Sequence, residues 1–189
     1  SLVGSEMCIR DRLSCNPSYK NWEYISSARI VIFLSSNILD KYIESLDQNK
    51  EYFYQSDIRY FNNIRYNIDN YVISGNLEPL YEIFIVYSKR AKDRIKYSFE
   101  FLELEPDFTK DEEFYFDRED LSWFRTRFEM DDYWRKKIKN YALNLKVLGK
   151  EWPDIKETLD KRYKRFEKSI NQFDAEDVFE IFINSYTTL

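Results

Sequence analysis

The sequence has no histidine, and that absence removes several familiar kinds of active site. Catalysis by Ser-His-Asp or Cys-His groups is excluded, and so is the commonest side-chain ligand of transition metals. A Ser-Lys pair or a pair of carboxylates remains chemically open. Cys8 and Cys15 match no metal-binding spacing and are too few for a disulfide framework, so they do not identify a redox compartment. We therefore expect no catalytic residue, cofactor or metal site in this chain.

Glycine and proline are also scarce, with three and four residues in a chain of 189. A β-sandwich or barrel needs many turns and normally uses more of both residues. The composition therefore favours helices with few connections. Long apolar runs are missing as well. Because the run Ile30–Leu34 is only five residues long, we expect no membrane-spanning segment.

The first twelve residues resemble a translated sequencing adaptor rather than native protein. They contain neither the apolar stretch of a signal peptide nor a helical period, so residues 1–12 are excluded from the fold prediction. The native part is expected to occupy residues 13–189, with its true N-terminus missing.

Aromatic side chains are abundant, at 19% of the residues, within 43% hydrophobic and 33% charged residues. This balance is typical of a globular domain, in which the rings fill the seams between helices. Stacking of the rings on nucleic acid is the alternative. A net charge of −5 argues against a phosphate-binding surface, so no nucleic-acid partner is expected.

Apolar residues recur every three or four positions, which predicts a mainly α domain of about six helices. The expected helices lie near 22–46, 56–74, 76–102, 130–148, 153–170 and 174–186. Residues suited to helix ends support these bounds: Ser56, Asn76 and Asp174 as caps, Gly75 and Gly149 as ends, and Pro153 in a first turn. In the last helix, the residues expected to face inward are Val178, Phe179, Phe182 and Tyr186.

The helical period stops between Glu105 and Phe128, which predicts a long connection with room for a short extended segment. Its acidic residues, Asp111, Glu112, Glu113, Asp117, Glu119 and Asp120, fit a solvated loop better than a calcium site, because the spacing and glycine of an EF-hand are missing. Two basic clusters follow, at 135–139 and 161–165. They are interpreted as solvated helix faces paired with nearby acids, such as Glu157 with Lys161.

Three tryptophans are candidate interaction or domain-packing residues, namely Trp123, Trp134 and Trp152. Tryptophan is enriched at the energetic centres of protein interfaces. The alternative is that these rings close the ends of helix seams.

The order of several motifs resembles one known family. The matching blocks include Gln55–Ile58, Gly75–Leu77, Trp134–Asn140, Leu143–Lys150, Ile155–Tyr163 and Glu176–Phe179. From about Leu39 onward, the chain resembles the N-terminal region of the tail-specific proteases, also called carboxy-terminal processing peptidases. Residues 173–175 depart from the family pattern without disturbing the predicted helix cap.

The resemblance implies a part of a serine protease of the bacterial periplasm or cell envelope. Such an enzyme recognises the apolar C-terminal tails of protein substrates and degrades or processes them. The resemblance places a PDZ domain and a protease domain with a Ser/Lys dyad after this region, so the chain is expected to be truncated before both. No residue here matches the nucleophile or the general-base lysine.

The implied role is a non-catalytic structural domain that packs on the PDZ and protease domains, helps to shape the substrate cavity and docks an adaptor protein. The alternative is a free-standing helical interaction module, whose aromatic stripes and long loop form a groove for partner helices or peptides. A basic-helix nucleic-acid binder is a third reading, which the acidic net charge disfavours.

Overall fold

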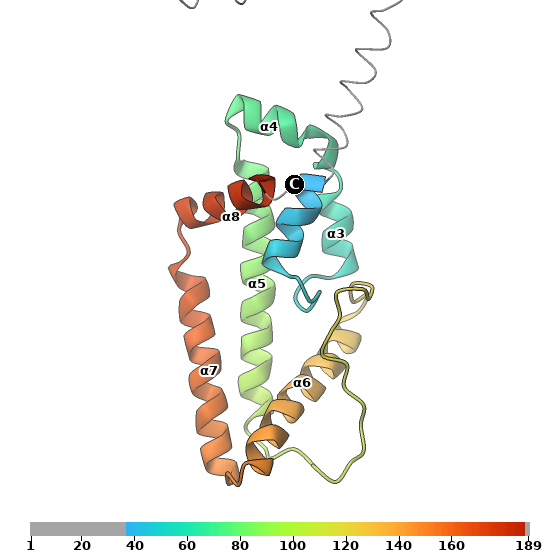
Figure 1. Cartoon of the computed structure of the whole chain (residues 1–189), viewed down its shortest axis with the longest axis vertical. Coiled ribbons are helices and arrows are strands. Elements are labelled where there is room, and N and C mark those ends of the chain that lie inside the picture. The colour runs from blue at the N-terminus through green and yellow to red at the C-terminus, as the bar shows by residue number, and fades with distance from the viewer. Residues whose placement is uncertain (1–36, 188–189) are drawn as a thin grey trace, which may run out of the picture.

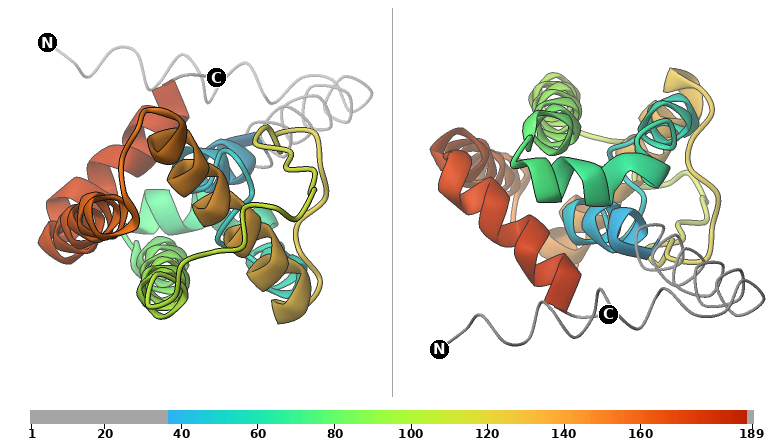
Figure 2. Two further views of the ribbon diagram at one scale, coloured as in Figure 1. Left: turned by 90° about the horizontal axis from the view of Figure 1, so that it is seen from below. Right: turned by 90° about the horizontal axis from the view of Figure 1, so that it is seen from above.

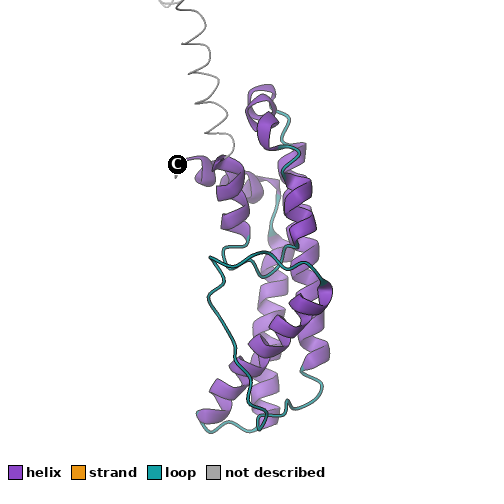
Figure 3. Cartoon of the chain, turned by 90° about the vertical axis from the view of Figure 1, so that its right-hand side faces the viewer, coloured by secondary structure: helices purple, strands orange, loops and turns teal. Residues whose placement is uncertain are grey.

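The chain folds as an assembly of helices around one long central helix, α5. The computed structural model describes residues 37–187, and no β-strand occurs within that range (Figures 1 and 3). Its helices are a segment at 37–46, α3 (Gln55–Phe61), the 3₁₀ turn η1 (Arg65–Asn67), α4 (Ile68–Ser74), α5 (Glu78–Phe101), α6 (Arg127–Val147), α7 (Trp152–Gln172) and α8 (Ala175–Thr187). The mainly α prediction is confirmed. Residues 1–12, both cysteines and the run Ile30–Leu34 lie outside the described residues.

Several helix ends follow the expected local chemistry. Gly75 and Gly149 adopt φ of +70° and +85°, the left-handed conformation that glycine takes without a steric penalty. At the start of α8, the Asp174 carboxylate accepts N–H bonds from Glu176 and Asp177, at 2.9 and 3.0 Å. Asp177 Oδ2 in turn accepts the Asp174 N–H at 3.0 Å, which completes the predicted capping box.

The expected helix at 56–74 is wrong as one element, because it divides into α3, η1 and α4. Asn62 and Asn63 follow α3, and asparagine favours turns because its side chain competes for local hydrogen bonds. The start also differs. The cap is Tyr54 rather than Ser56, and its N–H donates to the Asp57 carboxylate at 2.9 Å.

Two hydrophobic clusters lie along α5. The first joins the 37–46 segment, α3, the start of α5 and α8, through residues such as Tyr42, Phe61 and Phe182. The second joins the rest of α5 with α6 and α7, and these three helices lie next to one another in the end-on views (Figure 2). Tyr87 packs against both clusters. The central helix therefore links the two halves of the fold.

The last helix, α8, packs back onto the first described helix. The rings of Tyr42 and Phe182 meet edge to face with centroids 5.5 Å apart. Val178 is also buried, as expected. Phe179 was expected to face inward and does not, because 39% of its surface is exposed; the side chain of Tyr186 lies outside the described part. No helix in the described range is both long and apolar enough to cross a bilayer.

Candidate functional site

The long connection between α5 and α6, residues 103–125, runs beside α6 in the opposite direction (Figures 1 and 3). We call this segment the strap. Its only pairing with an extended neighbour in the described structure is an isolated parallel bridge between Tyr54 and Phe124, where the Gln55 N–H donates to the Phe124 carbonyl at 2.8 Å. The short extended segment expected in this connection is therefore limited to one bridge, at Phe124.

The beginning of the strap is fixed to the C-terminal end of α6. Lys146 Nζ lies 2.6 Å from the Glu105 carboxylate and 4.6 Å from the centre of the Phe108 ring. The cation therefore meets a carboxylate and the negative face of an aromatic ring together. The pair is largely exposed, so we assign its role mainly to setting the register of the strap.

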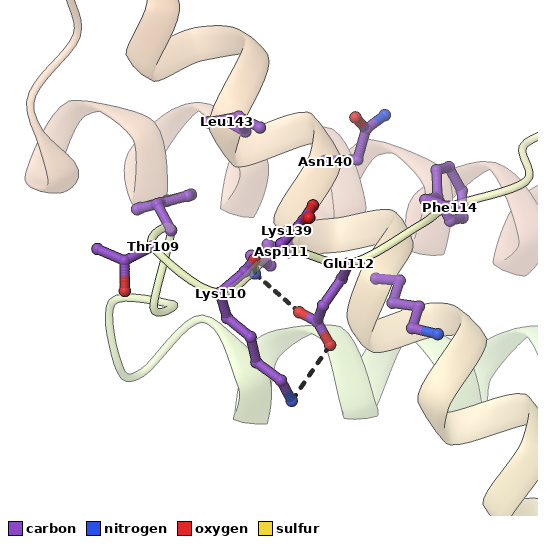
Figure 4. Close-up of a pocket in the computed structure, with 10 residues that line it drawn as sticks. Thr109, Lys110, Asp111, Glu112, Phe114, Lys139, Asn140 and Leu143 are labelled. Atoms are coloured by element: carbon purple, nitrogen blue, oxygen red, sulfur yellow. Dashed lines mark hydrogen bonds and ion pairs between the residues drawn. The ribbon is translucent and has the colours of Figure 1, made fainter.

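Glu112 is the central ionic contact between the strap and α6. Its side chain is only 10% exposed and accepts a hydrogen bond from Arg135 Nη1 at 3.0 Å. It also accepts one from Lys139 Nζ at 2.7 Å (Figure 4). Lys139 Nζ also donates to the carbonyl of Lys110 at 3.0 Å. The charged hydrogen bonds from Arg135 and Lys139 hold the pKa of the Glu112 carboxyl well below its usual range. The strap thus carries a carboxylate that stays ionised even in moderately acidic solution.

The far end of the strap is fixed by a buried cation, Arg118. Its guanidinium lies over the rings of Phe124 and Tyr133, at 3.9 and 4.9 Å from their centres. Arg118 Nη2 donates to the Ser122 carbonyl at 3.1 Å, whereas Nε has no hydrogen-bond partner. Burial lowers the pKa of Arg118. Aromatic faces stabilise this cation where no carboxylate in the described residues forms an ion pair with it.

A second buried carboxylate, Glu51, contacts α6 from the segment that precedes α3. It accepts the hydroxyl of Tyr133 at 2.7 Å and also contacts Lys137 Nζ. The Glu51 carbonyl accepts the indole N–H of Trp134 at 3.0 Å. Burial, followed by the nearby charge of Glu51, raises the pKa of Tyr133. One turn of α6 is therefore held by hydrogen bonds to Glu51 and by aromatic contacts with the strap.

The turn before Glu51 is organised by Asp47. Its carboxylate accepts the N–H groups of Glu51, Tyr52 and Phe53, at 2.7, 2.9 and 2.9 Å. Burial nevertheless raises the pKa of Asp47 to about 6, because removing the charge from water outweighs these bonds. The first described helix ends at residue 46, the expected end of the helix predicted near 22–46. The burial of Asp47 was not visible in the sequence.

The structure changes the interpretation of the charged clusters. The basic residues at 135–139 are not a solvated helix face, because Arg135, Lys137 and Lys139 are paired and largely enclosed. The acidic stretch of the strap is likewise not simply solvated, since Glu112 forms ion pairs with Arg135 and Lys139. Glu112 lies 23 residues before Arg135 and 27 before Lys139, so periodicity along a single helix could not pair them. The cluster at 161–165 does show the expected exposed pair, between Glu157 and Lys161 at 2.6 Å.

A shallow pocket of about 300 Å³ lies where the strap crosses the middle of α6 (Figure 4). Phe108, Phe114 and Leu143 supply apolar lining, and Lys136 and Asn140 supply polar groups. Thr109 also lines the pocket, and its Oγ1 donates to the Asp107 carboxylate at 2.7 Å. In the described residues, no three His, Cys, Asp or Glu side chains converge in a metal-binding arrangement.

The three candidate tryptophans occupy different environments. Trp134 is 2% exposed and belongs to the second cluster. Trp123, in the strap, is partly buried and lies 5.9 Å from the Phe53 ring. Trp152 begins α7 and packs partly buried on the second cluster. The structure does not bring the three indoles together into one surface.

The outer side of the strap and the start of α6 carry large apolar side chains that face solvent. Tyr115, Phe116 and Phe128 are 67, 75 and 82% exposed. They lie on or beside a segment whose inner side is fixed by Glu112 and Arg118. These residues were not identified as a surface from the sequence, although Phe114, Tyr115 and Phe116 are three consecutive aromatic residues in a polar connection.

Comparisons with known proteins agree on one family. A family model described as the tail-specific protease N-terminal domain matches residues 26–189. Among curated proteins, the tail-specific protease of Haemophilus influenzae is 32% identical over 154 residues. That alignment covers 80% of this chain and 22% of the relative, so the chain spans about a fifth of the length of the curated protein it matches.

Proposed function

Because the chain belongs to the tail-specific protease family, as its N-terminal domain, we propose that it is the non-catalytic framework of a longer serine protease. In this proposal, a PDZ domain and a Ser/Lys protease domain belong to the same parent protein, which cleaves proteins with apolar C-terminal tails. The helical domain packs against those parts and helps to shape the substrate cavity. The proposed setting is the bacterial periplasm or cell envelope.

The observation that carries the framework role is the fixed strap. Ion pairs at both its start and its centre, and the stacking of Arg118 near its end, hold it against α6. A fixed backbone presents Phe116 and Phe128 without the entropy cost of ordering a mobile loop on contact. Exposed aromatic groups on such a support are suited to packing against another domain.

The tryptophans enter this proposal with different roles. Trp123 and Trp152 retain part of their surface, so we assign them to domain packing at opposite ends of α6. Trp134 is enclosed, so its contribution is internal. Docking of an adaptor protein remains part of the proposed role.

A chimaera tests the proposal. Residues 13–189 would replace the corresponding domain in the Haemophilus influenzae relative, and cleavage of an unfolded protein with an apolar C-terminus would be measured. We expect the chimaera to cleave and the 189-residue chain alone to be inactive. Phe116→Asp with Phe128→Asp should lower cleavage by the chimaera about tenfold, the scale of losing one interface centre.

Ile73→Asp is the matched control, because Ile73 is an equally exposed apolar residue on α4, outside the strap. It should leave cleavage unchanged. Full activity of the Phe116/Phe128 double variant would contradict the assignment of these two side chains to packing against another domain. Cleavage by the isolated chain, or an inactive chimaera, would contradict the framework role itself.

A further inference from the structure

A second surface feature lies away from the strap, where the N-terminal half of α5 meets the end of α7. It is an open groove of about 460 Å³. In Figure 1, α5 and α7 stand side by side, and the connection from α7 to α8 lies at the upper end of the pair. The groove is therefore built from two helices, α5 and α7, and from Phe173 in the connection that follows α7. The second hydrophobic cluster fixes the positions of these two helices.

The floor of the groove is apolar. Phe84 and Phe173 contact each other with ring centroids 5.2 Å apart, and Ile170 is buried beside them. Phe173 ends α7 in an extended conformation, which turns its ring toward α5. Ile85 is 63% exposed on the neighbouring part of the floor. An isoleucine on a well-packed helix gains nothing from this exposure, so a ligand that covered it would gain apolar contact.

The rim of the groove is cationic, and its two lysines differ from the other basic residues of α5. Within the described residues, Lys89 and Lys92 have no carboxylate at ion-pair distance. The remaining cations of the helix do: Arg90 pairs with Asp57, Arg94 with Asp131, and Lys96 with Glu100. Asp93 is the one acidic residue that lines the groove. The rim is therefore locally positive in a protein of net charge −5.

The two lysines lie close enough to the apolar floor for one ligand to contact both. Ile85, Lys89 and Lys92 follow one another at intervals of four and three residues on one face of α5. Seven residues of helix rise about 10 Å, the length of a short peptide segment. Ser88 and Asn171 line the same groove and offer hydrogen-bonding groups to a peptide backbone.

We propose that this groove binds a peptide segment of another protein that has a large apolar side chain flanked by carboxylates. The apolar side chain covers Ile85 and the Phe84–Phe173 pair, and the carboxylates meet Lys89 and Lys92. The cationic rim is complementary to the carboxylates of such a peptide. Two whole copies of this chain, each with a net charge of −5, repel each other, which disfavours a second copy as the occupant. The groove shares no lining residue with the strap, so this interaction is independent of the framework role.

The test is selection from a random 12-residue peptide library displayed on phage, with the 189-residue chain as the immobilised target. Enriched peptides are expected to combine an aromatic or branched apolar residue with two or more acidic residues. The most enriched peptide, synthesised with a fluorophore, should lose affinity at least about tenfold with Lys89→Glu/Lys92→Glu, and also with Ile85→Asp. Raising the salt concentration should weaken binding to the unchanged chain.

Lys164→Glu/Lys168→Glu is the matched control, because these lysines are exposed on α7 but do not line the groove. It should leave the affinity unchanged, and circular dichroism should show the same helix content in every variant. Enrichment of basic or purely apolar peptides would overturn the proposal, as would equal binding by the Lys89/Lys92 and control variants. Concentration-dependent dimers that Ile85→Asp abolishes would instead assign the groove to a second copy of this chain.

Discussion

At the scale of single residues, one carboxylate of the acidic strap forms the ion pairs that hold the strap against the basic part of α6. Glu112 lies among Arg135, Lys139 and, at 3.4 Å, Lys110. Its pKa is lower in the folded chain than in the unfolded chain, so the unfolded chain binds more protons at low pH. The stabilisation from Glu112 is therefore complete above the ordinary glutamate pKa and is lost as the pH falls below it.

Glu112→Gln should lower the free energy of unfolding by about 2 kcal/mol at pH 7, because it removes charged hydrogen bonds from an enclosed position. The difference from the unchanged chain should shrink as the pH falls from about 5 to about 3. Urea unfolding of both proteins at a series of pH values measures this difference in the free energy of unfolding. Glu113→Gln, on an exposed neighbour, is the control. A difference that stays constant with pH would show that the charge of Glu112 is not the cause.

The residues of this contact could be found in the sequence, but their pairing could not. Glu112 and Arg135 stood in two separate charged clusters, each of which had a sufficient explanation as a solvated surface. Their meeting depends on the path of the strap, which is a tertiary property. Asp47 and Arg118 were missed for a related reason. Polar residues are normally exposed, and only the surrounding packing shows these two to be buried.

At the scale of elements, local chemistry predicts helix ends well where a side chain or glycine acts on its own backbone. Gly75, Gly149 and the Asp174–Asp177 box needed no tertiary information. The division of 56–74 was missed because its apolar stripe continues through Asn62 and Asn63. The spacing of apolar residues shows which face of a helix is turned to the core. It does not show a break between two short helices whose apolar faces are both turned to the same core.

Asp174→Ala should destabilise the fold by about 1 kcal/mol, the usual cost of losing an N-cap. Two N–H groups of α8 lose their acceptor, so hydrogen exchange should accelerate first at Glu176 and Asp177. The measurement is amide exchange followed by NMR, together with the urea midpoint. Glu180→Ala, inside the same helix, should change neither appreciably. Unchanged exchange at the first turn in Asp174→Ala would refute the capping role.

At the scale of the whole molecule, α5 makes the two hydrophobic clusters depend on each other. Ile138 lies in the second cluster and is fully buried, whereas Trp123 packs against the first. Tyr87 packs against both clusters from the middle of the central helix. Loss of packing in one cluster should therefore lower the stability of the other cluster as well.

Ile138→Ala should lower the free energy of unfolding by about 2–5 kcal/mol, because it leaves a cavity in a close-packed cluster. Far-UV circular dichroism and tryptophan fluorescence should still report one coincident transition, at a lower urea concentration. Ile73→Ala, at an exposed site, is the control and should have little effect. Two separated transitions in Ile138→Ala would mean that the clusters unfold independently.

The return of α8 onto the first described helix also determines when the fold can be completed during synthesis. Tyr42 emerges from the ribosome 140 residues before Phe182, its partner in the first cluster. Until α8 has been made, the 37–46 helix lacks part of its apolar cover, while α5, α6 and α7 can already assemble from neighbouring segments. We therefore expect the second cluster to form before the first during translation, with the earliest described helix enclosed last.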